Sequence, residues 1–328
     1  MTVGIVGGGN ISDTHARAAQ AAGLTVAAVT GANESKARTL AAQYGAIHYR
    51  SVDDLLRTGL DLVLIGSPSG RHADEATAAV RAGCHVLVEK PLDISTSRID
   101  ALLAEVDRAG VRLGVFYQDR LKPDVVALKR CIETGELGTL VVATAEVKWS
   151  RPPEYYSGSR WRGTWALDGG GALINQGIHT LDLLLWLLGR AVRVSGVTAT
   201  RVHRIEAEDT AAALIGFESG VAATLVATTA ASPGQARRIE VVGSTGTASL
   251  DGDSLRRPQP AAAAALENVG SPVVSDATGH QRIIENFVHA IETGATPVCD
   301  GREARRSVAL VEAIYQASRS RTVVALDA

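Results

Sequence analysis

The sequence predicts two domains of different architecture: a doubly wound parallel α/β domain over residues 1–120, and an α+β domain with a large, mostly antiparallel open sheet over residues 121–328. The chain has 328 residues, which is long for a single hydrophobic core. Up to about residue 120, short apolar strands alternate with helical patterns. Beyond that point, strand-like segments follow one another and are joined by turn signals.

The first half is expected to alternate between strands and helices. Each expected strand is a short run of β-branched and aliphatic residues, and the continuous apolar run at 61–65 is typical of a strand buried on both faces. An alanine-rich helical pattern covers 15–22, and a further helix follows His72. The expected strands are 2–6, 25–30, 61–65, 85–88 and 112–116.

The second half is expected to place strands side by side as hairpins. Turn signals at 218–220 and 244–246 predict two of these hairpins. An aromatic and arginine-rich loop is expected at 152–162, and a loop or irregular edge at 256–277. The expected strands are 140–149, 192–202, 210–217, 221–228, 237–242, 247–250 and 322–326, and the expected helices are 125–134, 279–293 and 302–318.

Charge and cysteine content exclude several classes of partner. A formal net charge of -2 provides no field to attract nucleic acid or an anionic membrane. No apolar run reaches about 18 residues, and no secretory pattern is expected at the start of the chain. The three cysteines, Cys84, Cys131 and Cys299, are scattered and odd in number, which predicts a reducing, cytoplasmic setting.

A glycine-rich turn follows the first expected strand. In a dinucleotide-binding fold, the first glycine of such a turn permits tight bending, and the second lets the backbone approach the pyrophosphate at the start of a helix. Ser12 replaces the third glycine, and its small side chain still allows close packing. The turn therefore predicts a Rossmann-like cofactor site. The candidate residues are Gly7, Gly9, Asn10 and Ile11.

The end of the second expected strand bears on the choice of cofactor. An acid usually stands there to bind the ribose hydroxyls, but this chain has Thr30 and Gly31. Without a carboxylate to repel it, a 2′-phosphate can be accepted by Thr30, the turn amides and Lys36. We therefore favour NADP over NAD. The alternative is that Lys36 is a solvated helix charge and that either cofactor is used.

Further candidates follow the later strands, at the sheet edge where open α/β sheets bind ligands. Lys90 stands between a buried strand and Pro91, which fixes it better than a typical surface lysine, and a cis Lys90-Pro91 bond would aim it at the cofactor face. The cofactor-binding candidates at this edge are Ser67, Pro68, His72, Glu89, Lys90 and Gln118.

The stretch at 169–186 carries the strongest chemical signal. Three glycines lead into an apolar helix in which Asn175, His179 and Asp182 fall at i, i+4 and i+7, on one face. Burying these groups costs free energy unless they are paired or used. A histidine beside an orienting polar group suits the oxidation of an alcohol, because the hydroxyl proton must leave with the hydride. The catalytic candidates are Lys90, Asn175, His179 and Asp182.

Two other interpretations of this helix remain open. His179 can be a structural histidine satisfied by its neighbours. A metal site can be drawn from His179 and Asp182 with His203 or Asp209, but no cluster has a zinc-like ligand pattern, so no metal is expected.

With these motifs in view, the chain resembles the Gfo/Idh/MocA oxidoreductases, the family of glucose–fructose oxidoreductase and inositol dehydrogenase, over nearly its whole length. The resemblance implies an N-terminal Rossmann domain, a C-terminal open sheet often used for dimerisation, and oxidation of a ring hydroxyl on a sugar or cyclitol. Lys90 matches the family lysine that binds the reacting oxygen, and His179 matches its acid/base histidine. The motifs that carry the resemblance are the 7–12 turn with His15, Ser67-Pro68-Ser69 with His72, Glu89-Lys90-Pro91, Gln118-x-Arg120, and 169–171 with His179 and Asp182.

One position departs from the family pattern. Many members have an aspartate four residues before the histidine, where this chain has Asn175, and an amide cannot take a proton. The Asn-Gln-x-x-His form looks like that of members that oxidise UDP-linked N-acetylaminouronates. Arginines such as Arg120 and Arg160 can serve an acidic substrate of that kind. The substrate-binding candidates are Lys90, Arg120, Trp161, Arg162, Asn175 and His179.

The expected activity is NAD(P)-dependent hydride transfer to or from a ring carbon of a sugar or cyclitol, by a homodimer or homotetramer. Two alternatives stay open: a nucleotide-sugar dehydrogenase of the UDP-N-acetylaminouronate type, and a cofactor-dependent sensor or repressor without catalysis. Retention of both Lys90 and His179 argues against the sensor, which has no need of proton chemistry.

Overall fold

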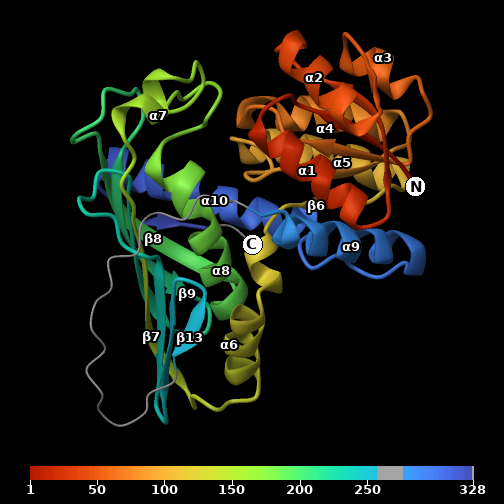
Figure 1. Ribbon diagram of the computed structural model, residues 1–328. Helices are drawn as coiled ribbons and strands as arrows, with labels where there is room; N and C mark the ends of the chain where they lie inside the picture. The colour runs from red at the N-terminus through yellow and green to blue at the C-terminus, as the bar shows by residue number, and fades with distance from the viewer. Residues whose placement is uncertain (257–275, 327–328) are drawn as a thin grey trace. The chain divides into compact units, whose positions relative to one another are not determined.

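The computed structural model describes residues 1–256 and 276–326, which fall into two compact units (Figure 1). One unit comprises Met1–Gln118 and Val274–Arg305, and the other comprises Asp119–Val273 and Arg306–Ala328. The loop expected at 256–277 lies almost wholly outside the described residues.

The first unit is a parallel six-stranded sheet in the order β3-β2-β1-β4-β5-β6. This order reverses between β1 and β4, as in dinucleotide-binding folds. The short strand β3 was not predicted, because its two residues give no periodic signal. The strands are β1 (Thr2–Val6), β2 (Thr25–Thr30), β3 (Ile47–His48), β4 (Leu62–Ile65), β5 (His85–Val88) and β6 (Leu113–Val115).

Helices connect these strands as the alternating pattern predicts. α1 begins earlier than expected, directly after the glycine turn. The helices are α1 (Asn10–Ala21), α2 (Glu34–Tyr44), α3 (Val52–Leu56), α4 (His72–Arg81) and α5 (Thr96–Ala109).

A late segment of the chain returns to the first unit. Helix α9 (Thr278–Thr293) packs Phe287 against β6 so closely that a Cβ on Gly114 would lie 2.7 Å from the Phe287 ring. The Val115 amide also donates to the Cys299 carbonyl oxygen (3.2 Å). A single boundary near residue 120, as expected from the sequence, does not anticipate this return.

The second unit is built on an eight-stranded sheet in the order β13-β12-β11-β7-β10-β9-β8-β14. β7 and β10 pair in parallel, and every other described pair in this sheet is antiparallel. The two predicted hairpins join β9 to β10 and β11 to β12. The strands are β7 (Leu140–Lys148), β8 (Ala191–Ala199), β9 (Thr210–Phe217), β10 (Ala222–Thr228), β11 (Arg238–Gly243), β12 (Thr247–Asp251), β13 (Ser254–Arg256) and β14 (Val324–Ala325).

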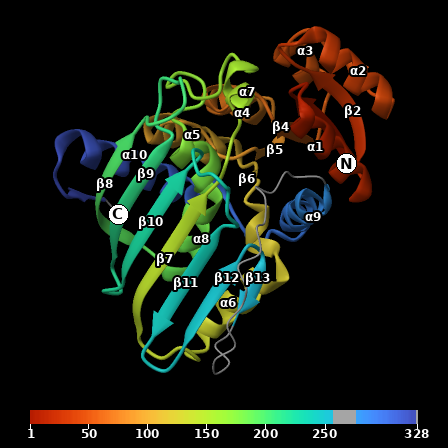
Figure 2. The same ribbon diagram turned by 60° about the vertical axis from the view of Figure 1, so that its left-hand side comes forward.

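Helices cover one face of this sheet, and no helix of the described residues covers the other (Figure 2). α6 (Pro123–Glu133) and α8 (Ile178–Leu188) lie behind the strands in that view. Alternate residues of the strands, such as Ala143 and Ala145, are buried beneath them. The opposite face includes Leu214, which is 54% exposed. α10 (Gly301–Ser320) completes the chain's helices in the described part, and none of these helices is long and apolar enough to cross a membrane.

Candidate active site

The glycine turn of the first unit leaves the start of α1 open. Gly7 has φ +145°, and a Cβ there would lie 2.3 Å from Ser12 Oγ and 2.9 Å from the Gly66 carbonyl oxygen. Gly9 occupies the N-cap position of α1, where it has no side chain to cap the helix. A Cβ built on it would have no described atom within 4 Å. The amides of Ser12 and Asp13 donate to the Gly9 carbonyl oxygen, and a pyrophosphate site at the start of α1 stays a prediction.

Among the described residues, no unpaired carboxylate follows the end of β2. Thr30 is buried. Gly31 lies so close to the glycine turn that a Cβ built on it would be 2.9 Å from the carbonyl carbon of Gly7. Asn33 caps α2 by accepting from the Lys36 amide (3.0 Å), and the Lys36 side chain is exposed. Glu34, the nearest acid, is salt-bridged on the helix surface.

His72 joins the two loops that follow β4 and β5. Its Nδ1 lies 2.8 Å from the Pro91 carbonyl oxygen and its Nε2 lies 2.8 Å from the Ser67 carbonyl oxygen. The ring is 1% exposed, so it braces these loops rather than offering itself to a cofactor as expected. The Lys90-Pro91 peptide bond is cis, as predicted.

Glu89 is likewise engaged inside the first unit. Its Oε1 accepts from His15 Nε2 (3.0 Å) and from His280 Nε2 (3.2 Å). Burial alone would raise the pKa of Glu89, but the hydrogen bonds from the two histidines hold it well below the usual value. Glu89 is thus a buried, ionised carboxylate that also accepts from the Lys90 amide (3.1 Å), and the expected direct contact with a cofactor gives way to this structural role.

The glycine triplet of the second unit does not lead into one continuous α-helix. Residues Ala172–Gly177 form a π-helical turn, and α8 begins only after it. The expected i, i+4, i+7 face is therefore wrong for Asn175, which lies in the wider turn. Such turns occur frequently at functional sites.

Close packing explains the glycines of this triplet. A Cβ on Gly171 would lie 1.9 Å from the Glu208 carbonyl oxygen, and one on Gly170 would lie 2.0 Å from the Tyr315 hydroxyl. The Glu208 carboxylate accepts from the amides of Gly171 (3.1 Å) and Leu173 (2.8 Å) and from the Tyr315 hydroxyl (3.1 Å). Glu208 therefore fixes the turn that carries the polar candidates.

Glu208 provides a stability prediction. Burial raises the pKa of Glu208 to about 7, so its proton is bound more tightly in the folded chain than in the unfolded one. The stabilisation that this bound proton gives to the folded chain is fully present below the pKa of the unfolded chain and is lost as the pH rises through about 7. The free energy of unfolding thereby falls by at most about 3 kcal/mol. Replacing Glu208 with glutamine should remove this loss. The melting temperature of the variant should therefore rise relative to that of the wild type as the pH is raised from about 5 to about 8.

The matched control is Glu218→Gln in the exposed hairpin between β9 and β10. A difference between Glu208→Gln and wild type that stays constant with pH would contradict the raised pKa.

Asn175 and His179 are the partly exposed residues of the otherwise buried stretch 171–180. The Asn175 amide donates to the Asp168 carboxylate, and its carbonyl oxygen accepts from Gln176 Nε2 (2.8 Å). Asp168 also accepts from the Gly163 amide (2.8 Å) and is 1% exposed. The orientation of the Asn175 amide is therefore set by its neighbours.

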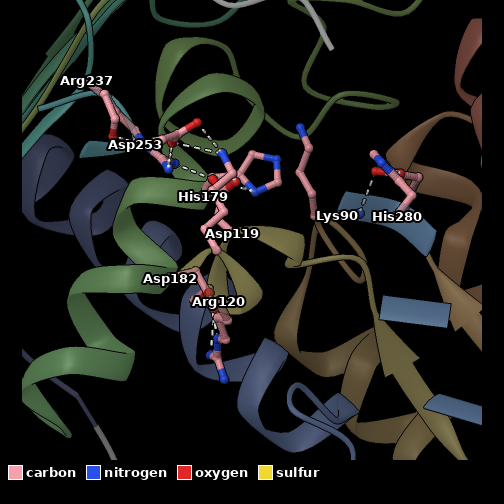
Figure 3. A network of polar contacts seen from close by, with 12 residues as sticks. Lys90, Asp119, Arg120, His179, Asp182, Arg237, Asp253 and His280 are labelled. Atoms are coloured by element: carbon pink, nitrogen blue, oxygen red, sulfur yellow. Dashed lines mark hydrogen bonds and ion pairs between the residues drawn. The ribbon is translucent and has the colours of Figure 1, made fainter. Parts of the chain in front are cut away.

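Asp182 and Arg120 form a buried ion pair rather than a substrate site (Figure 3). Arg120 Nε lies 2.8 Å from Asp182 Oδ2, and Arg120 Nη2 lies 2.7 Å from Asp182 Oδ1. Ser307 Oγ adds a hydrogen bond to the same carboxylate (3.2 Å). Arg120 is 1% exposed and Asp182 0% exposed, so the expected roles in substrate binding and catalysis give way to a structural one.

The carboxylate beside His179 comes from Asp119, which sequence reasoning missed (Figure 3). Asp119 Oδ2 lies 3.9 Å from His179 Nδ1, and Asp119 Oδ1 lies 2.7 Å from Lys122 Nζ. Arg237, also buried, pairs with the same carboxylate. Burial opposes ionisation, but the charges of Arg237, His179 and Lys122 hold the pKa of Asp119 far below its usual range. A permanent negative charge therefore stands next to the histidine.

The loop after β7 gathers cations on aromatic rings. It contains a short helix, α7 (Pro153–Ser157), where a plain loop was expected. The Arg162 guanidinium lies 4.3 Å from the centre of the Tyr155 ring and 5.3 Å from that of Trp161. The Arg151 guanidinium lies 5.1 Å from the centre of the Tyr155 ring. The Tyr155 hydroxyl accepts from Gln176 Nε2 (2.7 Å), so this group adjoins the π-helical turn.

The carboxylates considered for a metal site are occupied by protein donors. Asp209 accepts from the backbone amides of Arg201, Val202 and His203. Asp182 binds Arg120, as described above. Neither is arranged as a ligand set with His179 in the described part of the chain.

Two family profiles match the chain. Residues 1–117 match the Gfo/Idh/MocA profile described as an oxidoreductase family with an NAD-binding Rossmann fold, and residues 125–249 match the Gfo/Idh/MocA C-terminal domain. The chain belongs to the Gfo/Idh/MocA oxidoreductase family. It is therefore an oxidoreductase that binds a nicotinamide cofactor on its Rossmann domain.

Proteins similar to this Gfo/Idh/MocA chain include several dehydrogenases. An inositol 2-dehydrogenase of Rhizobium meliloti (strain 1021) is 28% identical over 95% of this chain and 96% of its own. A D-xylose 1-dehydrogenase (NADP(+)) of Haloferax volcanii is 28% identical over the whole of both chains. The WlbA dehydrogenase from Bordetella pertussis, solved with NADH and UDP-GlcNAcA, is 32% identical, covers 100% of this chain and 99% of its own, and has a TM-score of 0.89.

Proposed function

We propose that this protein transfers hydride reversibly between the nicotinamide ring and a ring carbon of a sugar or cyclitol, interconverting a hydroxyl and a ketone. The observation that carries the proposal is His179, partly exposed and held beside the ionised Asp119. The bound cofactor would supply the hydride acceptor or donor. Side chains of the protein carry out the proton transfer and stabilise the charge on the reacting oxygen.

His179 takes the proton of the substrate hydroxyl as the carbon–hydrogen bond breaks. Asp119 stabilises the imidazolium that forms, because its charge lies 3.9 Å from Nδ1. Lys90, at the end of β5, stabilises the alkoxide-like charge on the same oxygen. In the reverse direction His179 returns its proton to that oxygen.

Asn175 is assigned to substrate hydroxyls. Its amide is locked by Asp168 and Gln176, so it presents a fixed hydrogen-bonding edge instead of a proton acceptor. The carboxylate that many family members supply from this position is here supplied by Asp119.

For the cofactor, we propose that both nicotinamide dinucleotides are accepted and that NADP is preferred. Two observations support this preference: Lys36 on α2 is exposed, and residues 1–256 and 276–326 place no unpaired carboxylate at the end of β2. The relative from Haloferax volcanii is named for NADP, whereas the Bordetella pertussis enzyme was solved with NADH. Michaelis constants for both cofactors test the preference, and a clear advantage for NAD would overturn it.

A UDP-linked sugar acid is the second candidate substrate. Arg162 and Arg151 on the Tyr155 ring, beside Gln176, form a cationic group suited to phosphate or carboxylate. The Asn175-Gln176 pair before His179 and the similarity to the WlbA dehydrogenase solved with UDP-GlcNAcA favour the same class.

The experiment that tests the function is nicotinamide absorbance at about 340 nm with free sugars, inositols and UDP-sugars, each offered with NAD and with NADP. Turnover with inositols or free sugars supports the first candidate, and turnover with UDP-uronates alone supports the second. Tight cofactor binding with silence across the panel would favour the sensor alternative.

We also propose that the protein forms a homodimer or homotetramer through the open face of its second sheet. Val197 (68% exposed) and Leu214 (54% exposed) lie on this face, among small residues. Covering such an apolar surface favours self-association. Leu214→Glu is expected to lower the mass measured by light scattering to that of a smaller assembly. A wild-type monomer at micromolar concentration would contradict the proposal.

Location in the cytoplasm is part of the same proposal. Cys84, Cys131 and Cys299 are buried thiols outside any disulfide in the described part of the chain, as a reducing compartment allows. Cell fractionation of the native host tests this, and recovery from an oxidising compartment would overturn it.

A further inference from the structure

Three buried side chains from distant parts of the sequence meet at the end of β5 within the first unit. His15 comes from α1, Glu89 from the end of β5 and His280 from α9, and they are 0%, 7% and 2% exposed. Oε1 of Glu89 accepts from His15 Nε2 (3.0 Å) and from His280 Nε2 (3.2 Å). The other oxygen, Oε2, accepts from the backbone amide of Lys90 (3.1 Å).

The hydrogen bonds of this cluster determine which ring nitrogen of each histidine carries a hydrogen. A carboxylate only accepts, so each histidine carries a hydrogen on Nε2 and a neutral ring suffices for both bonds. His15 is further fixed by stacking on Phe116, with ring centroids 4.4 Å apart and planes inclined by 12°. Two charge-assisted hydrogen bonds on one oxygen prevent rotation of the carboxylate, which leaves its second oxygen directed at the Lys90 amide.

We propose that His280 is a positioning residue for Lys90, acting through Glu89. The two histidines fix the Glu89 carboxylate, the carboxylate fixes the main chain at Lys90, and the lysine side chain starts from a defined backbone. The inference rests on the role of Lys90 in the proposed function. It also explains why α9 returns to the first unit, since this helix supplies one of the two donors.

The same three residues also have the spacing of a metal site, because their ligand atoms lie within 4.8 Å of one another. The hydrogen-bonding interpretation is favoured because one carboxylate oxygen serves both rings and the other is used by Lys90. Metal analysis of the purified protein separates the two. A stoichiometric metal in the wild type that is absent from a His280 variant would overturn the positioning role.

The kinetic test compares His280→Gln with His280→Asn. The glutamine amide nitrogen reaches the place of Nε2, whereas the asparagine amide stops near Nδ1, so both variants bury an amide but only one keeps the bond to Glu89. We expect His280→Asn to lower kcat by about 10- to 100-fold, the scale of one hydrogen bond to a charged group. KM for the sugar and Kd for the cofactor should change little, and His280→Gln should recover most of the rate.

His289→Gln on the exposed side of α9 is the matched control. Equal losses in the glutamine and asparagine variants would reduce His280 to a packing residue and overturn the proposal. So would an unchanged kcat in His280→Asn.

A double-mutant cycle tests the route through Lys90. If His280 acts only through Lys90, Lys90→Met with His280→Asn should be no slower than Lys90→Met alone, whereas independent effects would multiply. Loss of turnover in Lys90→Met with full turnover in His280→Asn would overturn the inference alone. Full turnover in Lys90→Met would instead overturn the proposed function.

Discussion

Replacing Lys90 with methionine is expected to lower kcat by about two to four orders of magnitude, the range for one charge-stabilising or acid–base group. Methionine keeps an unbranched apolar stem but removes the ammonium that stabilises charge on the reacting oxygen. Because the glycine turn and α1 are untouched, the Kd for the cofactor should remain close to that of the wild type. Steady-state kinetics and a fluorescence titration of the cofactor measure the two quantities separately.

Lys148→Met is the control for this variant, since that ammonium pairs with Glu146 in strand β7. Near wild-type turnover in Lys90→Met would remove Lys90 from the mechanism. A lost cofactor affinity would show that the lysine binds the cofactor instead.

Replacing His179 with glutamine is expected to reduce turnover to a similar extent, by about 10²- to 10⁴-fold. Glutamine can still donate a hydrogen bond to a substrate oxygen, but it cannot take the proton. The remaining rate should rise with pH, because hydroxide in the solvent then replaces the missing base. A pH series of kcat for both proteins measures this change.

His289→Gln again serves as the control, because its ring is exposed on α9. A His179→Gln variant with wild-type turnover and an unchanged pH profile would show that the proton is taken elsewhere.

The fold followed from local patterns in the sequence. Apolar runs such as 61–65 and turn signals such as 218–220 report the conformation of their own residues, and the parallel sheet and the antiparallel hairpins were predicted from them. The return of α9 to the first unit was not predicted. It depends on contacts such as Phe287 against Gly114, which join residues far apart in the sequence and leave no local signal.

The candidate site was predicted in part for the same reason. His179 and the glycine triplet stand out in the sequence, but the partner of His179 is Asp119, which lies unremarked inside the Gln118-x-Arg120 motif. Arg120 and Asp182 were interpreted as functional because charged groups stood near the histidine. Their burial as an ion pair depends on tertiary packing, which spacing alone does not reveal.

The central claim is that hydride moves between the nicotinamide ring and a ring carbon of the substrate. The most direct test uses an active substrate from the panel, carrying deuterium on the carbon that bears the reacting hydroxyl. The account predicts that the deuterium appears at C4 of the reduced nicotinamide, as mass spectrometry and NMR of the isolated cofactor would show. Deuterium that is instead released to water would contradict hydride transfer.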